Sequence, residues 1–318
     1  MTALSPGRCR INTASPCIHP WPTLICPVCG PLREASAGDA LQPGNQQACG
    51  EAQAVLAAVR AGLAAGHRHF DLLGGELLLR PEALDLLTQA RRDGAQGLAV
   101  WTSGTLLARP QAAARIRQAG ATQVVVGLFG DSPAAHDYVA GTDGHFQRVL
   151  AGLRAARAAK LGVWVAAPLL RPTFRGLPGL VQKTLPAGIA GVHLWAPPGP
   201  DRSSQPLLAP LAIMAPWLQA ALTILATAKR PWRIDGVPAC LLGEWAQLQP
   251  EWPLWRAMEP LAAEPETAGD ANEFAATCAD CTWRSSCVGV PAARARGHGW
   301  LGLQPRTDAP KAAQQELS

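Results

Sequence analysis

Apolar residues follow two alternating spacings between residues 51 and 229 of this 318-residue chain. Short continuous apolar runs, such as the three valines at 124–126, are typical of strands that are buried on both faces. Between these runs, apolar residues recur every three or four positions, which is typical of helices that bury one side. We predict strands at 22–25, 69–73, 98–101, 123–128, 163–169 and 191–195, and helices at 55–63, 81–90, 110–119, 146–161, 177–185 and 207–228.

Strands and helices that alternate at this pace predict an α/β fold of about six parallel βα units. The loops at the carboxyl ends of the strands are where such folds place their catalytic groups. The pattern stops near residue 230, and three cysteines lie close together in the region that follows. We therefore predict a barrel-like domain at 1–229 with a Cys/Pro-rich region at 1–50, a small module at 230–303 and a flexible tail at 304–318.

Charge and hydropathy exclude two classes of partner. The net charge is only +5, and no block of Lys and Arg stands out, so nucleic acid is not indicated. Residues 1–7 lack the apolar core of a secretory signal, and no segment approaches the ~18 consecutive apolar residues of a membrane span. We expect a cytoplasmic protein without a membrane partner.

The cysteines give the first indication of chemistry. The nine are Cys9, Cys17, Cys26, Cys29, Cys49, Cys240, Cys278, Cys281 and Cys287, and none lies between residues 50 and 239. An odd number gathered at two ends of a chain without an export signal favours metal binding over disulfides. The tail has the spacing C-x2-C-x5-C, and Cys240 is a candidate fourth ligand. Four thiolates suit either zinc or a 4Fe–4S cluster, and the spacing leaves both open.

A second group of cysteines lies near the start of the chain. Cys17, Cys26 and Cys29 have the spacing C-x8-C-x2-C, and Cys9 is an alternative to Cys17. A structural zinc site is an alternative for this group.

Polar residues follow several of the predicted strands. Gly74, Gly75 and Glu76 come directly after the strand at 69–73, and Ser103 follows the next strand. At the rim of a parallel sheet, the Glu76 carboxylate is suited to holding the ammonium group of a ligand; a solvated turn is the alternative.

The motifs and their order resemble the radical S-adenosylmethionine (SAM) enzymes that carry a C-terminal SPASM or twitch module. The matching segments are GGELLLRP at 74–81, TSGTLL at 102–107, LFGD at 128–131, HD at 136–137, GTDGHF at 141–146, GVPAC at 236–240 and the tail cysteines. Together they cover roughly residues 20–292.

This resemblance implies a fold, cofactors and partners. The fold is a partial (β/α)6 TIM-like barrel with a Cys-rich auxiliary module. Cys17, Cys26 and Cys29 would hold a 4Fe–4S cluster with one open iron for SAM, and Gly74, Gly75, Glu76 and Ser103 would bind SAM itself. Cys240, Cys278, Cys281 and Cys287 would hold one auxiliary cluster. Cleavage of SAM by an external reductant such as flavodoxin or ferredoxin would give a 5′-deoxyadenosyl radical that abstracts hydrogen from a precursor peptide, a protein or a cofactor precursor.

The chain departs from the family pattern in two places. The usual C-x3-C-x2-C motif would put its first cysteine at Pro22, which cannot bind iron, so Cys17 has to replace it. A further tail cysteine is absent, with Pro291 in its place, which favours one auxiliary cluster. The alternatives are a degenerate, non-catalytic relative that acts as a metal-binding partner or scaffold, and a two-site zinc protein.

Two histidines are weaker candidates. His136 with Asp137 is either an acid–base pair or part of a helix cap, and we favour the cap. His193 lies in a predicted strand, and we favour a core histidine over one that points into the barrel.

Overall fold

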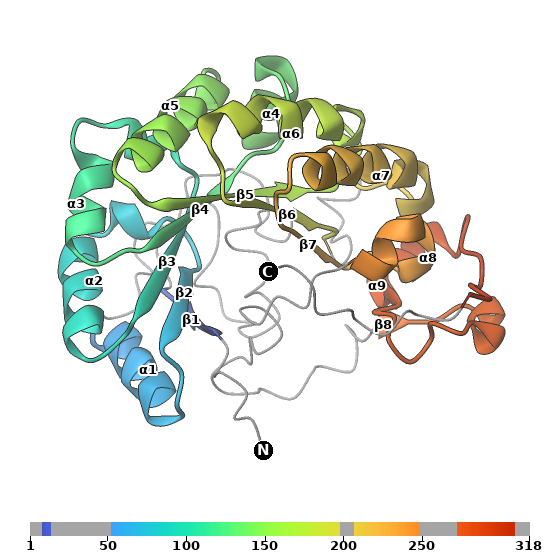
Figure 1. Ribbon diagram of the computed structural model, residues 1–318, viewed down its shortest axis with the longest axis horizontal. Helices are drawn as coiled ribbons and strands as arrows, with labels where there is room; N and C mark the ends of the chain where they lie inside the picture. Colours follow the sequence, from blue (N-terminus) through green and yellow to red (C-terminus); the bar gives the residue numbers. More distant parts are fainter. Residues whose placement is uncertain (1–7, 14–51, 198–206, 249–271, 309–318) are drawn as a thin grey trace.

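The computed structural model describes residues 8–13, 52–197, 207–248 and 272–308. Its main sheet has seven strands, all parallel, in the order of the sequence. The strands are β1 Arg8–Asn12, β2 His69–Leu73, β3 Gly97–Thr102, β4 Gln123–Gly127, β5 Gly162–Pro168, β6 Gly191–Trp195 and β7 Trp232–Asp235. Figure 1 shows the sheet curled into an open arc, with the helices along its outer side. This confirms the expected partial barrel.

Helices connect successive strands. They are α1 Ala52–Ala64, α2 Ala83–Arg92, α3 Ala112–Gln118, α4 Pro133–Ala140, α5 His145–Ala158, α6 Leu177–Thr184 and α7 Leu211–Thr227. Beyond β7 lie α8 Ala239–Leu242, α9 Ala292–His298 and a two-stranded antiparallel sheet of β8 Asn272–Glu273 and β9 Val290–Pro291. Among the helices described here, none is long and apolar enough to cross a membrane.

Alternate strand residues divide between two environments. One set packs against the helices in a single apolar core, as Phe70, Val126 and Leu194 do. The other set faces the concave side of the arc, because successive residues of a strand point to opposite faces. Trp101 and His193 belong to this second set, and they contact each other edge to face with ring centroids 5.7 Å apart. Burial on both faces explains why the central strands read as continuous apolar runs.

The predicted strands from 69 to 195 are confirmed to within one residue at each end. The first strand is different: residues 22–25 lie outside the described part of the chain, and the strand that pairs with β2 is Arg8–Asn12. The sheet also has a seventh strand, β7, and helix α4 was not predicted. The short β7 has only two buried residues, Trp232 and Ile234, which is too brief a pattern to identify a strand.

Candidate functional site

Glu76 lies at the carboxyl end of β2 and is only 2% exposed. Its carboxylate accepts hydrogen bonds from the Thr102 hydroxyl at 2.8 Å on both oxygens. Oε2 also accepts from the Ser103 backbone N–H and the Ser103 hydroxyl, each at 2.8 Å. Oε1 accepts from the Leu78 backbone N–H at 3.3 Å. Glu76 therefore fastens the turn after β2 to the turn after β3.

The backbone of these turns depends on glycine. Gly74 and Gly75 have φ values of 94° and 79°, and Gly104 has 84°, which are left-handed conformations that side chains disfavour. The Gly74 carbonyl accepts from the Thr13 hydroxyl at 2.9 Å, so the residue after β1 joins the same network. Three successive loops are thus held together at the carboxyl edge of the sheet, where this fold class places its ligands.

These contacts bear on the role predicted for Glu76. Burial raises the pKa of Glu76, and the hydrogen bonds from Ser103, Thr102 and Leu78 offset part of that rise. Both carboxylate oxygens already accept bonds from the protein, so the described role of Glu76 is to fix the rim. That Gly74, Gly75, Glu76 and Ser103 bind a ligand there stays a prediction. Thr102, which lies in the TSGTLL motif but was not predicted to bind a ligand, belongs to the same clamp.

Cys9, one of the candidate N-terminal ligands, belongs to strand β1 and is fully buried. Its side chain is on the helix side of the sheet: a Cβ added at Gly62 of α1 would lie 3.4 Å from Cys9 Sγ. Burial, with a smaller contribution from Asp71, raises the pKa of the Cys9 thiol to about 11, so the thiol stays protonated. Cys9 is therefore a core residue. Cys17, Cys26 and Cys29 lie outside the described residues, in the segment that joins β1 to α1.

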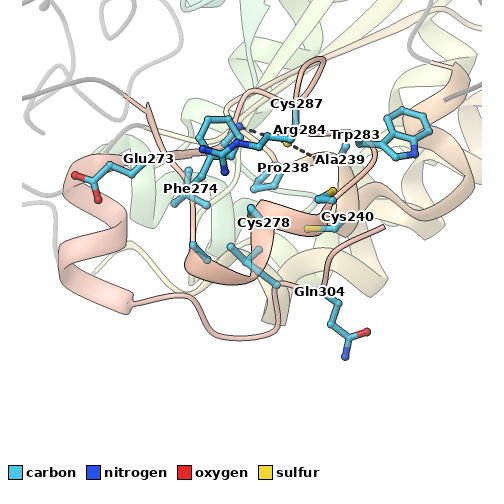
Figure 2. Close-up of a pocket in the computed structure, with 15 residues that line it drawn as sticks. Pro238, Ala239, Cys240, Glu273, Phe274, Cys278, Trp283, Arg284, Cys287 and Gln304 are labelled. Carbon is cyan, nitrogen blue, oxygen red and sulfur yellow. Dashed lines mark hydrogen bonds between the residues drawn. The ribbon is translucent and has the colours of Figure 1, made fainter. Parts of the chain in front are cut away.

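The four tail cysteines line one pocket. Cys240 comes from α8, and Cys278, Cys281 and Cys287 come from the segment between β8 and β9. Figure 2 shows this pocket, with Pro238 and Phe274 also in its wall. The chain therefore brings together residues that are 38 or more positions apart in sequence, as predicted from the cysteine spacing.

Backbone N–H groups point at the sulfurs of this pocket. Cys287 Sγ accepts from the N–H groups of Ala239 and Gly289, each at 3.4 Å. Cys281 Sγ accepts from the Arg306 N–H at 3.3 Å. Such donors stabilise thiolates and tune the potential of iron–sulfur clusters.

The same pocket disfavours the ionised form of the Cys240 thiol. Burial raises the pKa of Cys240; the Gln304 backbone N–H lowers it, and the neighbouring Cys287 and Cys278 raise it further. Within the described ranges, no group of three or more His, Cys, Asp or Glu forms a single-ion site. A tetrahedral zinc needs Zn–S distances of about 2.3 Å. A 4Fe–4S cluster spreads its four thiolates over different irons. That the four tail cysteines hold either group stays a prediction.

Arg306, near the end of the described chain, contacts two residues of this module. Its guanidinium lies 4.5 Å from the centroid of the Trp283 ring. Its carbonyl accepts from the backbone N–H and the hydroxyl of Thr282, each at 2.9 Å. Residues 304–308, which the sequence assigned to a flexible tail, thus pair with residues 282–283. Nothing in the local sequence indicates this long-range contact.

His136 and Asp137 lie in α4. The Asp137 carboxylate accepts from the backbone N–H groups of Gly144 and Phe146 at 2.7 Å, so it caps the start of α5, which confirms the favoured interpretation. The His136 ring lies 2.8 Å from the His145 ring, Nε2 to Nδ1, and both histidines are buried.

The buried His145 predicts a pH dependence of stability. Burial, with the nearby Arg148, lowers the pKa of His145 from 6.5 to about 4. The folded-state pKa lies below the unfolded value, so His145 contributes stability that is present above pH ~6.5 and is lost as the pH falls to about 4. We expect a loss of about 3 kcal/mol over this interval. Urea unfolding at several pH values measures it, and His145→Asn should flatten the profile; an unchanged profile would contradict the assignment.

His193 is buried, but it faces the concave side of the arc with Trp101, so the favoured interpretation of a histidine that does not point into the barrel is wrong. Its partner comes from the neighbouring strand. Its Nε2 lies 2.7 Å from Asp235 Oδ2. The Arg233 Nε donates to both oxygens of the same carboxylate, at 2.7 and 2.8 Å. Burial alone would raise the pKa of Asp235, but His193 and Arg233 hold it well below its usual value. The group stabilises the β6–β7 edge of the sheet.

Comparison with known proteins agrees with this geometry. Residues 21–174 match the radical SAM superfamily. GTP 3′,8-cyclase of Xanthomonas campestris pv. campestris (strain B100) is 41% identical over 102 residues, which are 32% of this chain and 30% of that protein. AdoMet-dependent heme synthase of Methanosarcina barkeri (strain Fusaro / DSM 804) is 34% identical over 88 residues, 28% of this chain and 25% of that protein. The chain thus spans less than a third of the length of these relatives.

Solved structures share the fold at low identity. SuiB of Streptococcus suis bound to S-adenosylmethionine has a TM-score of 0.56 at 11% identity, over 73% of this chain and 50% of SuiB. The protein anSMEcpe with bound AdoMet has a TM-score of 0.52 at 17% identity, over 73% of this chain and 65% of that one. The match over residues 21–174 identifies this part of the chain as a radical SAM domain, and the curled parallel sheet agrees with it.

Proposed function

We propose that this protein is a radical SAM enzyme that uses an external reductant, such as flavodoxin or ferredoxin, to cleave SAM and abstract hydrogen from a substrate. The observation that carries the proposal is the position of Cys9 inside β1, with its thiol packed under α1. It leaves Cys17, Cys26 and Cys29 as the three ligands that the spacing predicts; Cys49, the fourth cysteine of the β1–α1 segment, belongs to no such motif. Three ligands leave one iron of a 4Fe–4S cluster open for SAM, whereas a fourth cysteine would close it.

The neighbouring loops support a ligand site beside that segment. Thr13 follows β1 directly and donates to the Gly74 carbonyl, so the loop that carries the three cysteines starts next to the Gly74–Gly75 turn. The Glu76 clamp holds this turn against Ser103. We propose that Gly74, Gly75 and Ser103 orient the methionine end of SAM while Glu76 keeps them in place. When bound, the cluster supplies the electron that breaks the carbon–sulfur bond of SAM.

We propose that the four tail cysteines hold one auxiliary 4Fe–4S cluster in a module of the SPASM or twitch type. All four thiols line the same pocket, and backbone N–H groups donate to two of their sulfurs. With a thiolate on every iron, no iron is open, so this cluster would transfer electrons or stabilise the module and would not bind SAM.

Replacing Cys240, Cys278, Cys281 and Cys287 together by serine should lower the iron content of the anaerobically reconstituted protein by about half, because it removes every thiolate of one of two clusters. SAM cleavage should persist, since the N-terminal set of cysteines is untouched. Iron analysis together with the electron paramagnetic resonance spectrum of the reduced protein measures this. Unchanged iron would show that the tail cysteines hold no cluster.

For the substrate we propose a peptide or protein side chain, with a cofactor precursor as the second class. One SuiB structure with the same fold has its precursor peptide SuiA bound. The partial matches in sequence are to a GTP 3′,8-cyclase and a heme synthase, which favour the second class. The first class is supported if a short open reading frame lies beside this gene and its peptide product gains a cross-link or loses hydrogen on incubation with the enzyme and SAM. Turnover of a nucleotide or porphyrin precursor instead would support the second.

The proposal is tested by anaerobic reconstitution. We expect a brown protein with two clusters' worth of iron that bleaches under dithionite. A colourless protein that retains zinc would overturn it in favour of a two-site zinc protein.

A further inference from the structure

A second pocket lies between the start of α7 and helix α9. It is lined by Pro210, Leu211, Ala212, Val290, Arg294, His298, Gly299, Leu301 and Leu303. The first turn of a 17-residue helix forms one wall. Its first N–H groups have no partner within the helix, and the helix dipole makes this end positive. The pocket is therefore favourable for negative charge before any side chain is considered.

Arg294 adds a buried positive charge to this pocket. Its side chain is among the largest fully buried ones, and the residue is 1% exposed. Nε donates to the Pro197 carbonyl at 2.7 Å and Nη1 to the Ala209 carbonyl at 2.9 Å. Nη2 is buried and has no hydrogen-bond partner in the described structure. A buried guanidinium with an unused donor is costly unless an anion or a water satisfies it.

A histidine and a second arginine lie close to Arg294. His298 follows it by four residues on α9, so both residues are on one side of that helix. The buried His298 Nε2 also has no hydrogen-bond partner in the described structure. Burial lowers the pKa of His298, and the charges of the nearby Arg294 and Arg171 lower it further, so the ring is neutral at pH 7. Arg171 donates from Nε to the Leu208 carbonyl at 2.9 Å, just before α7.

No carboxylate balances these charges in the described ranges. The salt bridges found there involve Arg60, Arg80, Arg233, Arg306 and His193, and none contains Arg171, Arg294 or His298. Arg is rarely buried without a negative partner. The buried Arg294 guanidinium, the unpartnered Nη2 and Nε2 atoms and a helix N-terminus around one pocket therefore indicate an anion that completes the site.

We propose that this pocket binds the carboxylate or phosphate group of a small molecule, with Arg294 Nη2, His298 Nε2 and the first N–H groups of α7 as its donors. Pro197, whose carbonyl accepts the hydrogen bond from Arg294 Nε, comes two residues after β6. The site thus lies at the carboxyl edge of the sheet, the same edge as the Glu76 clamp, where an anionic part of a substrate can reach it. The inference does not depend on radical chemistry, because an anion site can exist on an inactive barrel.

The test is thermal unfolding of the full chain with inorganic phosphate, acetate or chloride at matched ionic strength. We expect phosphate or acetate, and not chloride, to raise the melting temperature with a saturable dependence on concentration. The member of this pair that saturates at lower concentration identifies the class of ligand. His298→Phe and Arg171→Gln should each weaken the apparent affinity about tenfold, because each removes a charged or hydrogen-bonding group from the anion. Arg296→Gln, at an exposed position of the same helix, should leave it unchanged.

Two outcomes would overturn the proposal. Equal stabilisation by chloride would indicate a general salt effect. Unchanged affinity in both His298→Phe and Arg171→Gln would place any binding elsewhere. Arg294 is not used as the test residue, because it also holds two backbone carbonyls and its replacement affects folding.

Discussion

Replacing Cys17 by serine is expected to reduce SAM cleavage by at least about 100-fold, whereas replacing Cys9 by alanine should leave cleavage unchanged. A direct ligand should matter more than outer-shell partners, whose loss costs about 10- to 100-fold. Cys9 is a strand residue packed under α1, with a thiol that burial keeps protonated. Both cysteines precede the Cys26–Cys29 pair and were alternatives in the sequence, so the two variants separate the ligand from the core residue.

The measurement is 5′-deoxyadenosine formed under dithionite, together with iron content. Cys17→Ser should lose the iron of one cluster and keep that of the other. Cys9→Ala should keep both clusters and lose about 1 kcal/mol of stability, as is usual for a small deletion in a core. If Cys9→Ala loses a cluster and Cys17→Ser does not, the assignment of the first ligand is wrong.

Glu76→Ala should destabilise the fold by about 3 kcal/mol and abolish SAM binding. The buried carboxylate accepts from the Thr102 hydroxyl, the Ser103 N–H and the Ser103 hydroxyl. Each buried donor left without an acceptor costs about 1–3 kcal/mol, and the two hydroxyls can turn toward other partners. Glu76→Gln keeps the volume but offers only one acceptor oxygen, so we expect a smaller loss of stability and weakened SAM binding.

Urea unfolding of the full chain and equilibrium binding of SAM check this prediction. Asp85→Ala is the matched control, since Asp85 is an exposed carboxylate in the first turn of α2 and its loss should cost less than ~1 kcal/mol. A Glu76→Ala protein as stable as the Asp85→Ala control would show that the clamp does not hold the two turns together.

The alternating strands and helices of the barrel could be predicted from the sequence, because the strands are buried on both faces and the helices on one. The valines at 124–126 are all fully or almost fully buried, and this produces the continuous run. Strand β1 was missed because its buried Cys9 and Ile11 alternate with polar residues over only five positions, inside a region rich in Pro and Cys. Helix α4 was missed although Ser132 caps it and Pro133 occupies its first turn, which is a recognisable start signal.

Only part of the candidate site could be predicted from the sequence. The residue types of the Gly74–Glu76 turn and the tail cysteines were visible as motifs, but their partners were not. Thr102 and Glu76 are 26 residues apart, and the polar contact that joins them depends on the register of β2 and β3. Arg306 contacts Cys281 across 25 residues that include β9 and α9. Periodicity carries no information on such pairs, because it reports burial of one face and not the partner of a polar group.

The most direct test is whether the anaerobically reconstituted protein with Cys240, Cys278, Cys281 and Cys287 all replaced by serine, which retains only the N-terminal set of cysteines as cluster ligands, cleaves SAM. With dithionite and SAM, we expect 5′-deoxyadenosine and methionine in equal amounts. A protein that holds one 4Fe–4S cluster and yields no 5′-deoxyadenosine above the level of its Cys17→Ser counterpart would contradict it. The barrel would then be a degenerate, non-catalytic member of its superfamily.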